Sequence, residues 1–297
     1  MKIVFASTGE IGSQILRGLV ASCHEVVAVY TSPPKEAGRG QKFVYNPVWH
    51  VANEFKIPVY TPQNFKTEDV KDEFLKIEHD IAVVFSYGFL LPDWFIFGKF
   101  QAINLHPSAL PLYRGAAPVE RCIENGDKYT EICTILMTKA LDAGDIIEKM
   151  PINIDENWTS DDIFDQVKTH GAGIILKSLD KVKDANFATK PQESGHTYAK
   201  KIDKSELLLN LSDSCIRNFN KIRAFTTHGY CYIVHSGERI KIISAKMEKC
   251  DVKSDKIATI GQNFELYCND GVILPQIVQR QGKNQVKIDD FLRGWRL

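Results

Sequence analysis

Short apolar runs alternate with helical patterns through the first half of the chain. The apolar runs predict strands buried on both faces of a sheet, and apolar residues spaced three and four positions apart predict amphipathic helices between them. The predicted strands are Lys2–Ala6, Glu25–Tyr30, Ile81–Ser86, Ala102–Leu105 and Ile132–Met137, and the predicted helices are Gly12–Ser22, Pro47–Phe55, Glu68–Lys76 and Pro118–Glu124. Strands that alternate with helices predict an α/β fold with an open, Rossmann-like, mostly parallel sheet.

The pattern changes toward the C-terminus. A helix is predicted from Thr159 to about Lys177, because a capping hydroxyl precedes two acidic residues. Periodicity is lost between Thr189 and Ser205. The elements predicted beyond it are a helix at Ser212–Phe225 and short strands at Cys231–Val234, Arg239–Lys246, Lys256–Ile260, Glu265–Cys268 and Val272–Gln279. Short strands in this number predict a small OB-like β-barrel. We therefore predict a large domain over residues 1–189, a linker over 190–205 and a smaller C-terminal domain over 206–297.

The composition is that of an ordinary globular protein. The chain has 297 residues, of which 44% are hydrophobic and 25% charged. No apolar run approaches the roughly 18–20 residues that span a bilayer, and the N-terminus lacks the apolar stretch of a signal peptide. We therefore expect no membrane association, and a location in the cytoplasm of a bacterium or in the matrix of an organelle.

The net charge of zero conceals an uneven distribution. From Lys190 to the end there are 18 Lys and Arg against 12 Asp and Glu, a net charge of +6, which leaves −6 for residues 1–189. A basic C-terminal part suits a polyanionic partner such as RNA, although a modest excess of this kind also arises by chance on protein surfaces.

Asn104 lies near the end of the strand predicted at Ala102–Leu105, and His106 directly follows it. Two positions apart on an extended backbone, their side chains share one face. In an open α/β sheet, ligands bind beyond the carboxyl ends of the strands, where these residues lie. There an amide can donate to a developing oxyanion while an imidazole moves a proton, which is the chemistry of acyl transfer. The alternative is a structural histidine that completes local hydrogen bonds.

Asp142 lies in a loop shortly after the strand predicted at Ile132–Met137. A carboxylate beside the imidazole would orient it and raise its pKa, and Gly144 would let the backbone approach a planar ligand closely. Two alternatives remain open. Asp142 could be an ordinary turn residue, and Asp145 could be the acid that matters.

Three segments in the right order resemble the folate-dependent formyltransferase family. They are Asn104-Leu105-His106-Pro107-Ser108, Tyr113-Arg114-Gly115-Ala116-Ala117-Pro118 and Leu141-Asp142-Ala143-Gly144-Asp145. The resemblance implies a catalytic triad of Asn104, His106 and Asp142, with 10-formyltetrahydrofolate as formyl donor and neither a metal nor NAD. It also implies folate contacts from two segments, Tyr87, Gly88, Phe89 and Leu90 at the pterin pocket and Ser108, Ala109, Leu110 and Pro111 in a neighbouring loop.

Further segments resemble those family members that formylate the methionine of initiator methionyl-tRNA. The loop with Gly38, Arg39, Gly40 and Lys42 is similar to their insertion loop, and His196–Ile202 is similar to their interdomain segment. The resemblance implies that these loop residues, together with Lys200 and Lys201, contact tRNA. We expect a monomer. Arg223-Ala224-Phe225 and the stretch from Gly282 to Gly294 are similar to the second domain of the same enzymes.

The chain departs from the family pattern at three places. Ser7–Gly12 replaces the usual Gly-Thr-Pro turn, Ala140 stands where glycine is usual, and Arg223–His228 lacks the usual Trp-Pro. The residues leave three rival functions open. They are formylation of a nucleotide-linked amino sugar, RNA binding without catalysis, and NAD-dependent redox chemistry, although Gly9-x-x-Gly12 lacks the full dinucleotide fingerprint.

Overall fold

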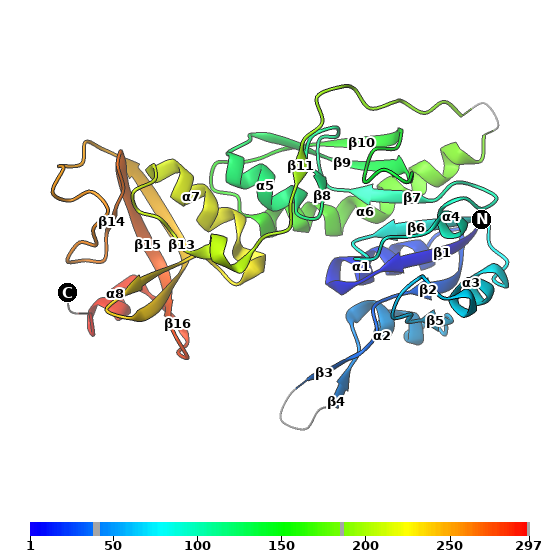
Figure 1. The fold of residues 1–297 in the computed structure, drawn as a ribbon, viewed down its shortest axis with the longest axis horizontal. Helices are drawn as coiled ribbons and strands as arrows, with labels where there is room; N and C mark the ends of the chain where they lie inside the picture. Colours follow the sequence, from blue (N-terminus) through cyan, green and yellow to red (C-terminus); the bar gives the residue numbers. More distant parts are fainter. Residues whose placement is uncertain (38–41, 185–186, 296–297) are drawn as a thin grey trace. The chain divides into compact units, whose positions relative to one another are not determined.

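The computed structural model describes residues 1–37, 42–184 and 187–295, which fold into two compact units (Figure 1). The first unit consists of Met1–Arg114, Glu131–Ile152 and Phe164–Thr197. The second consists of Gly115–Thr130, Asn153–Ile163 and Tyr198–Leu297. The domain boundaries that we placed at 189 and 205 remain a prediction.

The first unit is built on an open sheet with the strand order β10-β9-β7-β6-β1-β2-β5. The pairs β1–β2, β1–β6, β2–β5 and β6–β7 are parallel, whereas β9 lies antiparallel to β7. The strands are β1 (Lys2–Ser7), β2 (Glu25–Tyr30), β5 (Val59–Tyr60), β6 (Ile81–Phe85), β7 (Ile103–His106), β9 (Tyr129–Leu136) and β10 (Ile146–Asn153). The predicted Rossmann-like, mostly parallel sheet is confirmed.

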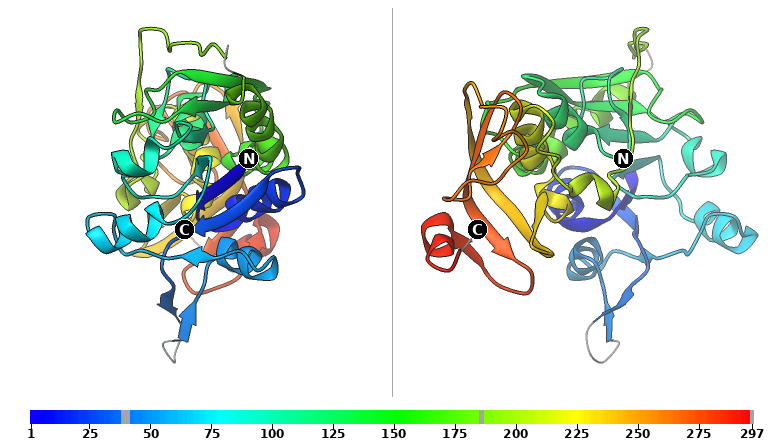
Figure 2. Two further views of the ribbon diagram at one scale, coloured as in Figure 1. Left: turned by 90° about the vertical axis from the view of Figure 1, so that its right-hand side faces the viewer. Right: turned by 60° about the vertical axis from the view of Figure 1, so that its left-hand side comes forward.

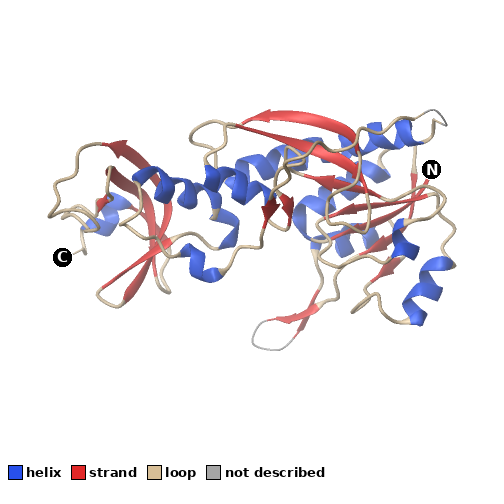
Figure 3. Cartoon of the chain, turned by 45° about the horizontal axis from the view of Figure 1, so that its top comes forward, coloured by secondary structure: helices blue, strands red, loops and turns tan. Residues whose placement is uncertain are grey.

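Helices and one hairpin connect these strands. The helices are α1 (Gly9–Val20), α2 (Pro47–Glu54), α3 (Glu68–Leu75), α4 (Asp93–Ile96), α5 (Pro118–Asn125) and α6 (Ser160–Val182). Helix α2 begins after Asn46, whose side chain accepts hydrogen bonds from the backbone of Val48 and Trp49. The hairpin of β3 (Lys35–Ala37) and β4 (Lys42–Val44) extends away from the sheet (Figure 3). No helix in the described part of the chain is both long and apolar enough to cross a membrane.

Both glycines of Gly9-x-x-Gly12 have local structural roles. Gly9 opens α1 with a φ of +90°, a value that other residues rarely adopt. A Cβ at Gly12 would collide with the side chain of Ser7, so glycine here lets α1 pack closely against the end of β1. These roles account for the motif without a dinucleotide.

An aromatic cluster forms part of the core of the first unit. Tyr30 at the end of β2 stacks on Tyr60 at a centroid distance of 4.9 Å and meets the edges of Phe74 and Phe95. Phe65 joins the same cluster and contacts Tyr87, which follows β6. The cluster therefore fixes the start of the segment that we predicted to bind the pterin.

The second unit contains a curled antiparallel sheet (Figure 2). Its strand order is β12-β13-β15-β14, and β16 pairs with β15. Register shifts between Ile242 and Ala245 interrupt the pairing of β13 with β15, and such irregularities bend a strand. The remaining elements of the chain are β8 (Arg114–Gly115), β11 (Tyr198–Ala199), η1 (Lys204–Leu207), α7 (Cys215–Ala224), η2 (Thr226–His228), β12 (Tyr232–His235), β13 (Glu238–Lys249), β14 (Leu266–Tyr267), β15 (Gly271–Arg280), β16 (Gln285–Lys287) and α8 (Ile288–Leu292).

The strand predicted at Lys256–Ile260 is wrong. Its residues form turns, in which the backbone N–H of Lys256 donates to the carbonyl of Lys253 and that of Thr259 to the carbonyl of Lys256. Ile260 makes one isolated bridge to Leu266. Lys256, Ala258 and Thr259 are exposed and only Ile257 and Ile260 are partly buried, so this short stretch has little apolar surface to bury.

Candidate active site

Asn104, His106 and Asp142 come together in the first unit. The first two lie on β7 and share one face of it, as predicted, while Asp142 lies in the connection between β9 and β10. The Asn104 amide donates to Asp142 Oδ1 at 3.2 Å, and His106 Nδ1 lies 3.7 Å from Asp142 Oδ2. One carboxylate thus faces both an amide and an imidazole.

The His106 ring is held from its other side by a backbone carbonyl. Its Nε2 lies 2.9 Å from the carbonyl oxygen of Tyr113, and only 5% of the side chain is exposed. Because a carbonyl oxygen can only accept, Nε2 must carry a proton in this arrangement. Nδ1 is therefore the nitrogen that can gain or lose a proton, and it is the one that faces Asp142.

Asp142 adopts an unusual backbone conformation. Its φ is +48°, in the left-handed region, which Asp tolerates better than most residues. A Cβ at Gly144 would collide with the carbonyl oxygen of Leu136, so glycine is needed there for packing within the protein. The sequence had suggested instead that Gly144 makes room for a ligand.

Asp145 is engaged elsewhere. Its carboxylate accepts a hydrogen bond from Thr189 Oγ1 at 2.5 Å, and its backbone carbonyl accepts from the N–H of Leu136. Between the two acids that the sequence left open, Asp142 is the one that the fold places beside His106.

Two residues that the sequence did not single out support this loop. The Gln192 amide donates to the backbone carbonyls of Asp142 and Gly144, each at 2.8 Å. Its Oε1 accepts from Nε and Nη2 of Arg114, at 3.0 and 2.7 Å. Arg114 lies inside a segment that carried the family resemblance, whereas Gln192 lies where periodicity is lost and has no local signal.

The residues predicted at the pterin pocket differ in exposure. Tyr87 is buried against Phe65, its hydroxyl has no hydrogen-bond partner among the described residues, and burial raises its pKa. Gly88 has a φ of +79°, Phe89 is partly buried, and Leu90 is 91% exposed. The segment therefore anchors one aromatic side chain and presents an apolar one at the surface.

The second segment predicted to contact folate is packed into the protein at alternate positions. Ser108 is fully buried and donates to the carbonyl of Leu112 at 2.7 Å, while Leu110 packs with Cys133, Ile135 and Ile146. Ala109 and Pro111 are partly exposed. The side chains of Ser108 and Leu110 are thus engaged inside the fold.

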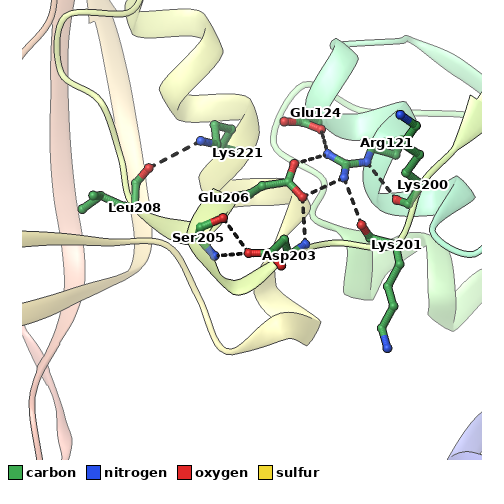
Figure 4. A network of polar contacts seen from close by, with 9 residues as sticks. All are labelled: Arg121, Glu124, Lys200, Lys201, Asp203, Ser205, Glu206, Leu208 and Lys221. Carbon is green, nitrogen blue, oxygen red and sulfur yellow. Dashed lines mark hydrogen bonds and ion pairs between the residues drawn. The ribbon is translucent and has the colours of Figure 1, made fainter.

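Among the residues predicted to bind tRNA, Gly38, Arg39 and Gly40 lie outside the described residues. The backbone of Lys42 pairs with Ala37 in the hairpin. Lys200 and Lys201 are exposed, and their backbone carbonyls accept from the Arg121 guanidinium at 3.2 and 3.5 Å (Figure 4).

Arg121 is itself held by two carboxylates within the second unit. Its Nη1 lies 2.7 Å from Glu124 and 2.8 Å from Glu206, and its pKa is raised chiefly by the hydrogen bond to Glu206 (Figure 4). Glu206 also closes a capping box with Asp203 at the start of η1. The backbone of the two lysines is therefore tied to a charge network.

No set of three or more His, Cys, Asp or Glu side chains within the described ranges is arranged to hold a metal ion. The polar side chains of the site instead contact one another and the backbone. An amide, an imidazole and a carboxylate in this arrangement can stabilise an oxyanion and move a proton.

Comparisons with known proteins place the chain in a family. Residues 1–179 match the formyl transferase family, and residues 201–296 match the C-terminal domain of formyl transferases. Methionyl-tRNA formyltransferase of Rickettsia bellii (strain RML369-C) is 34% identical over 298 residues, which cover 100% of this chain and 97% of the relative.

Solved structures show the same fold at low sequence identity. An N-formyltransferase from Helicobacter canadensis, in complex with folinic acid and dTDP-3-aminofucose, is 17% identical and has a TM-score of 0.69 over 93% of this chain and 99% of that one. Methionyl-tRNA formyltransferase from Clostridium thermocellum is 16% identical and has a TM-score of 0.60 over 84% and 94% of the two chains. From its full-length relatives and both matched domains, the chain belongs to the methionyl-tRNA formyltransferase family.

Proposed function

We propose that the chain transfers the formyl group of 10-formyltetrahydrofolate to the α-amino group of methionyl initiator tRNA, for translation initiation. The catalytic residues of this proposal are Asn104, His106 and Asp142. The observation that carries the proposal is the Asp142 carboxylate, which lies 3.2 Å from the Asn104 amide and 3.7 Å from His106 Nδ1. The full-length relationship to methionyl-tRNA formyltransferases supports the choice of acceptor.

In the proposed reaction the methionyl amine attacks the formyl carbon. The carbonyl oxygen then gains negative charge, which the Asn104 amide and a His106 protonated at Nδ1 stabilise. One such donor typically lowers a barrier by about 3–4 kcal/mol. Nε2 is held by Tyr113, so Nδ1 is the nitrogen that serves as donor in this proposal.

Proton movement is assigned to Asp142. The attacking amine loses a proton and the departing folate nitrogen gains one, so the net reaction needs only a transfer between them. Asp142 accepts the proton that the amine loses and passes it on to the departing folate nitrogen, which leaves the carboxylate as it began. It also holds the His106 ring in place, as carboxylates next to a catalytic imidazole do. No covalent bond to the enzyme forms in this sequence of steps.

The donor and the tRNA have separate sites in the proposal. The folate contacts Tyr87, Gly88, Phe89, Leu90 and the loop Ser108–Pro111. Because Ser108 and Leu110 use their side chains internally, we assign the loop's contact to its backbone. Tyr87 has a buried hydroxyl without a partner in the described chain, which suits a polar ligand atom.

For the tRNA, Gly38, Arg39, Gly40 and Lys42 contact the acceptor arm, and Lys200 and Lys201 contact phosphates. Phosphate contacts by lysine position a nucleic acid without reading its sequence. The domain over residues 206–297 adds to the tRNA surface, and we propose that the enzyme acts as a monomer in the cytoplasm or an organellar matrix.

The test is transfer of a radiolabelled formyl group from 10-formyltetrahydrofolate. Methionyl initiator tRNA is compared with methionyl elongator tRNA and with a dTDP-linked amino sugar. We expect rapid labelling of the initiator tRNA and little labelling of the other two. Preferential labelling of the amino sugar would overturn the proposed acceptor, and the absence of transfer to any of the three would overturn the proposed activity.

A further inference from the structure

The hydrogen bonds of Gln192 fix the orientation of its amide group. Arg114 can only donate, so the oxygen of Gln192 must face it, and backbone carbonyls can only accept, so the amide nitrogen must face those of Asp142 and Gly144. Both hydrogens of the amide nitrogen are used. Gln192 therefore connects a cation on one side to two peptide groups of the Asp142 loop on the other.

The two carbonyls that Gln192 holds flank Ala143. The first belongs to the peptide plane between Asp142 and Ala143 and the second to the plane between Gly144 and Asp145, so Gln192 holds the backbone directly after Asp142 and at the far end of the loop. A residue in the left-handed region costs about 1–3 kcal/mol and persists only where its surroundings hold it. At Asp142, whose φ is +48°, the Gln192 amide is part of what holds the loop.

Arg114 extends the same connection to His106. It directly follows Tyr113, whose carbonyl oxygen accepts from His106 Nε2 at 2.9 Å. Tyr113 also has a positive φ, +60°, and its N–H donates to Thr197 Oγ1 while the N–H of Arg114 donates to the Thr197 carbonyl. The Arg114–Gln192 pair thus links two backbone segments. One carries Asp142, which faces Nδ1 of His106, and the other carries the Tyr113 carbonyl, which faces Nε2.

We propose that Gln192 and Arg114 are positioning residues, which set the placement of Asp142 relative to His106 by bracing the backbone on both sides of the imidazole. The proposal rests on the proposed function, because it needs Asp142 to act in formyl transfer. Neither residue touches the reacting atoms in it. Their effect passes through Asp142 and through the carbonyl of Tyr113.

The decisive variant is Gln192→Glu, which keeps the length of the side chain and the acceptor for Arg114. It replaces the amide donor with a carboxylate oxygen that faces two carbonyls, so the loop loses both hydrogen bonds that Gln192 donates to it. A misplacement of about 1 Å can reduce the rate about 100-fold. We expect kcat to fall about 10- to 100-fold, with the KM values for methionyl-tRNA and folate within about twofold of the wild type.

Three controls separate positioning from general damage. Gln14→Glu makes the same chemical change at a glutamine of α1 whose partly exposed side chain donates to Glu10, and should leave kcat unchanged. The double variant Gln192→Glu with Asp142→Asn should be no slower than Asp142→Asn alone, since Gln192→Glu keeps the acceptor for Arg114 and therefore disturbs only the Asp142 side. If Gln192→Glu does not fold, Gln192→Asn, whose shorter side chain cannot span both contacts, replaces it with the same expected results.

The outcomes are distinguishable. If the wild type does not formylate methionyl-tRNA, the proposed function fails. If the wild type is active and the folded Gln192 variant has the wild-type kcat, Gln192 does not position Asp142 for the reaction, and the inference is wrong. A variant that loses thermal stability while keeping kcat would likewise overturn positioning, because it would show a structural role only.

Discussion

Two regions of the molecule are held in opposite ways. One is the His106 cluster, made of Asn104, His106 and Asp142, which we propose to be catalytic, and the other is the lysine segment at Lys200–Lys201. At His106 the side chains are buried, and they contact a carboxylate and a backbone carbonyl. At Lys200 and Lys201 it is the backbone that is held, by Arg121, while the side chains are exposed. Buried donors of fixed direction suit the stabilisation of a transition state, whereas exposed cations suit a mobile polyanion.

This contrast predicts different kinetic signatures. Changes in the His106 cluster should lower kcat and leave the salt dependence of the KM for tRNA unchanged. Changes in the lysine segment should raise the KM for tRNA and alter its salt dependence while leaving kcat alone. The variants below test the contrast in order of decreasing expected effect.

His106→Ala should give the largest effect. It removes the Nδ1 proton that stabilises the developing oxyanion in our proposal, together with the ring that Tyr113 holds. Loss of one such donor typically reduces kcat about 10²- to 10³-fold, so we expect kcat to fall about 10³-fold. The matched control is His79→Ala, which also removes a ring whose Nδ1 lies 2.7 Å from a backbone carbonyl in the first unit. A folded His106→Ala enzyme with a near-native kcat would place His106 among structural histidines.

Asp142→Asn should have the next largest effect on kcat. Asn tolerates the left-handed conformation, so the loop keeps its shape while losing its charge, and we expect kcat to fall about 10²-fold. Asp145→Asn makes the same change at the acid that bonds Thr189 and should alter kcat by less than a few-fold. Single-turnover measurements of formyl transfer check both variants. A greater loss at Asp145 than at Asp142 would reverse our assignment of the acid.

Glu206→Gln tests how the backbone of the lysine segment is anchored. The hydrogen bond from Arg121 lowers the pKa of Glu206, so this pair stabilises the fold above the ordinary glutamate pKa, and the effect is lost as pH falls through the lowered value. At pH 7 we expect a loss of about 1 kcal/mol in the free energy of unfolding, because both side chains are partly exposed. Denaturant titrations should show the difference shrinking below about pH 4.

The control for this variant is Glu193→Gln, since Glu193 forms a looser, highly exposed pair with Lys190 at 3.9 Å. Its stability should match that of the wild type at every pH. If the two variants show the same change in the free energy of unfolding, the Arg121 network does not anchor the lysine segment, and the contrast between the two regions does not hold.

Lys200→Ala combined with Lys201→Ala should have the smallest effect. We expect the KM for methionyl-tRNA to rise several-fold with kcat unchanged, and the slope of log KM against log salt to fall by about 1 for each phosphate that a lysine no longer neutralises. Lys168→Ala, at an exposed position of α6, is the control and should change neither quantity. A drop in kcat with an unchanged salt slope would show that the lysines do not contact phosphate.

The sequence predicted strands correctly where an apolar run was long enough for its pattern to be recognised. The strands predicted at Ile81–Ser86 and Ala102–Leu105 correspond to β6 and β7, because continuous apolar runs are typical of strands covered on both faces. Strand β5 has only two residues, too few for a period to show. The stretch Lys256–Ile260 was predicted as a strand although it has no buried face, and it forms turns instead.

By itself the sequence determined which groups are available and on which side of a strand they lie. The side-chain period of two places Asn104 and His106 together, and the family resemblance singles out Asp142. Only the tertiary structure decided that Asp142 rather than Asp145 reaches His106, and that the carbonyl of Tyr113 holds Nε2. It also brought Gln192 to the Asp142 loop, 50 residues away along the chain. Such contacts depend on where the backbone returns after leaving the sheet, and no local pattern of residues encodes that path.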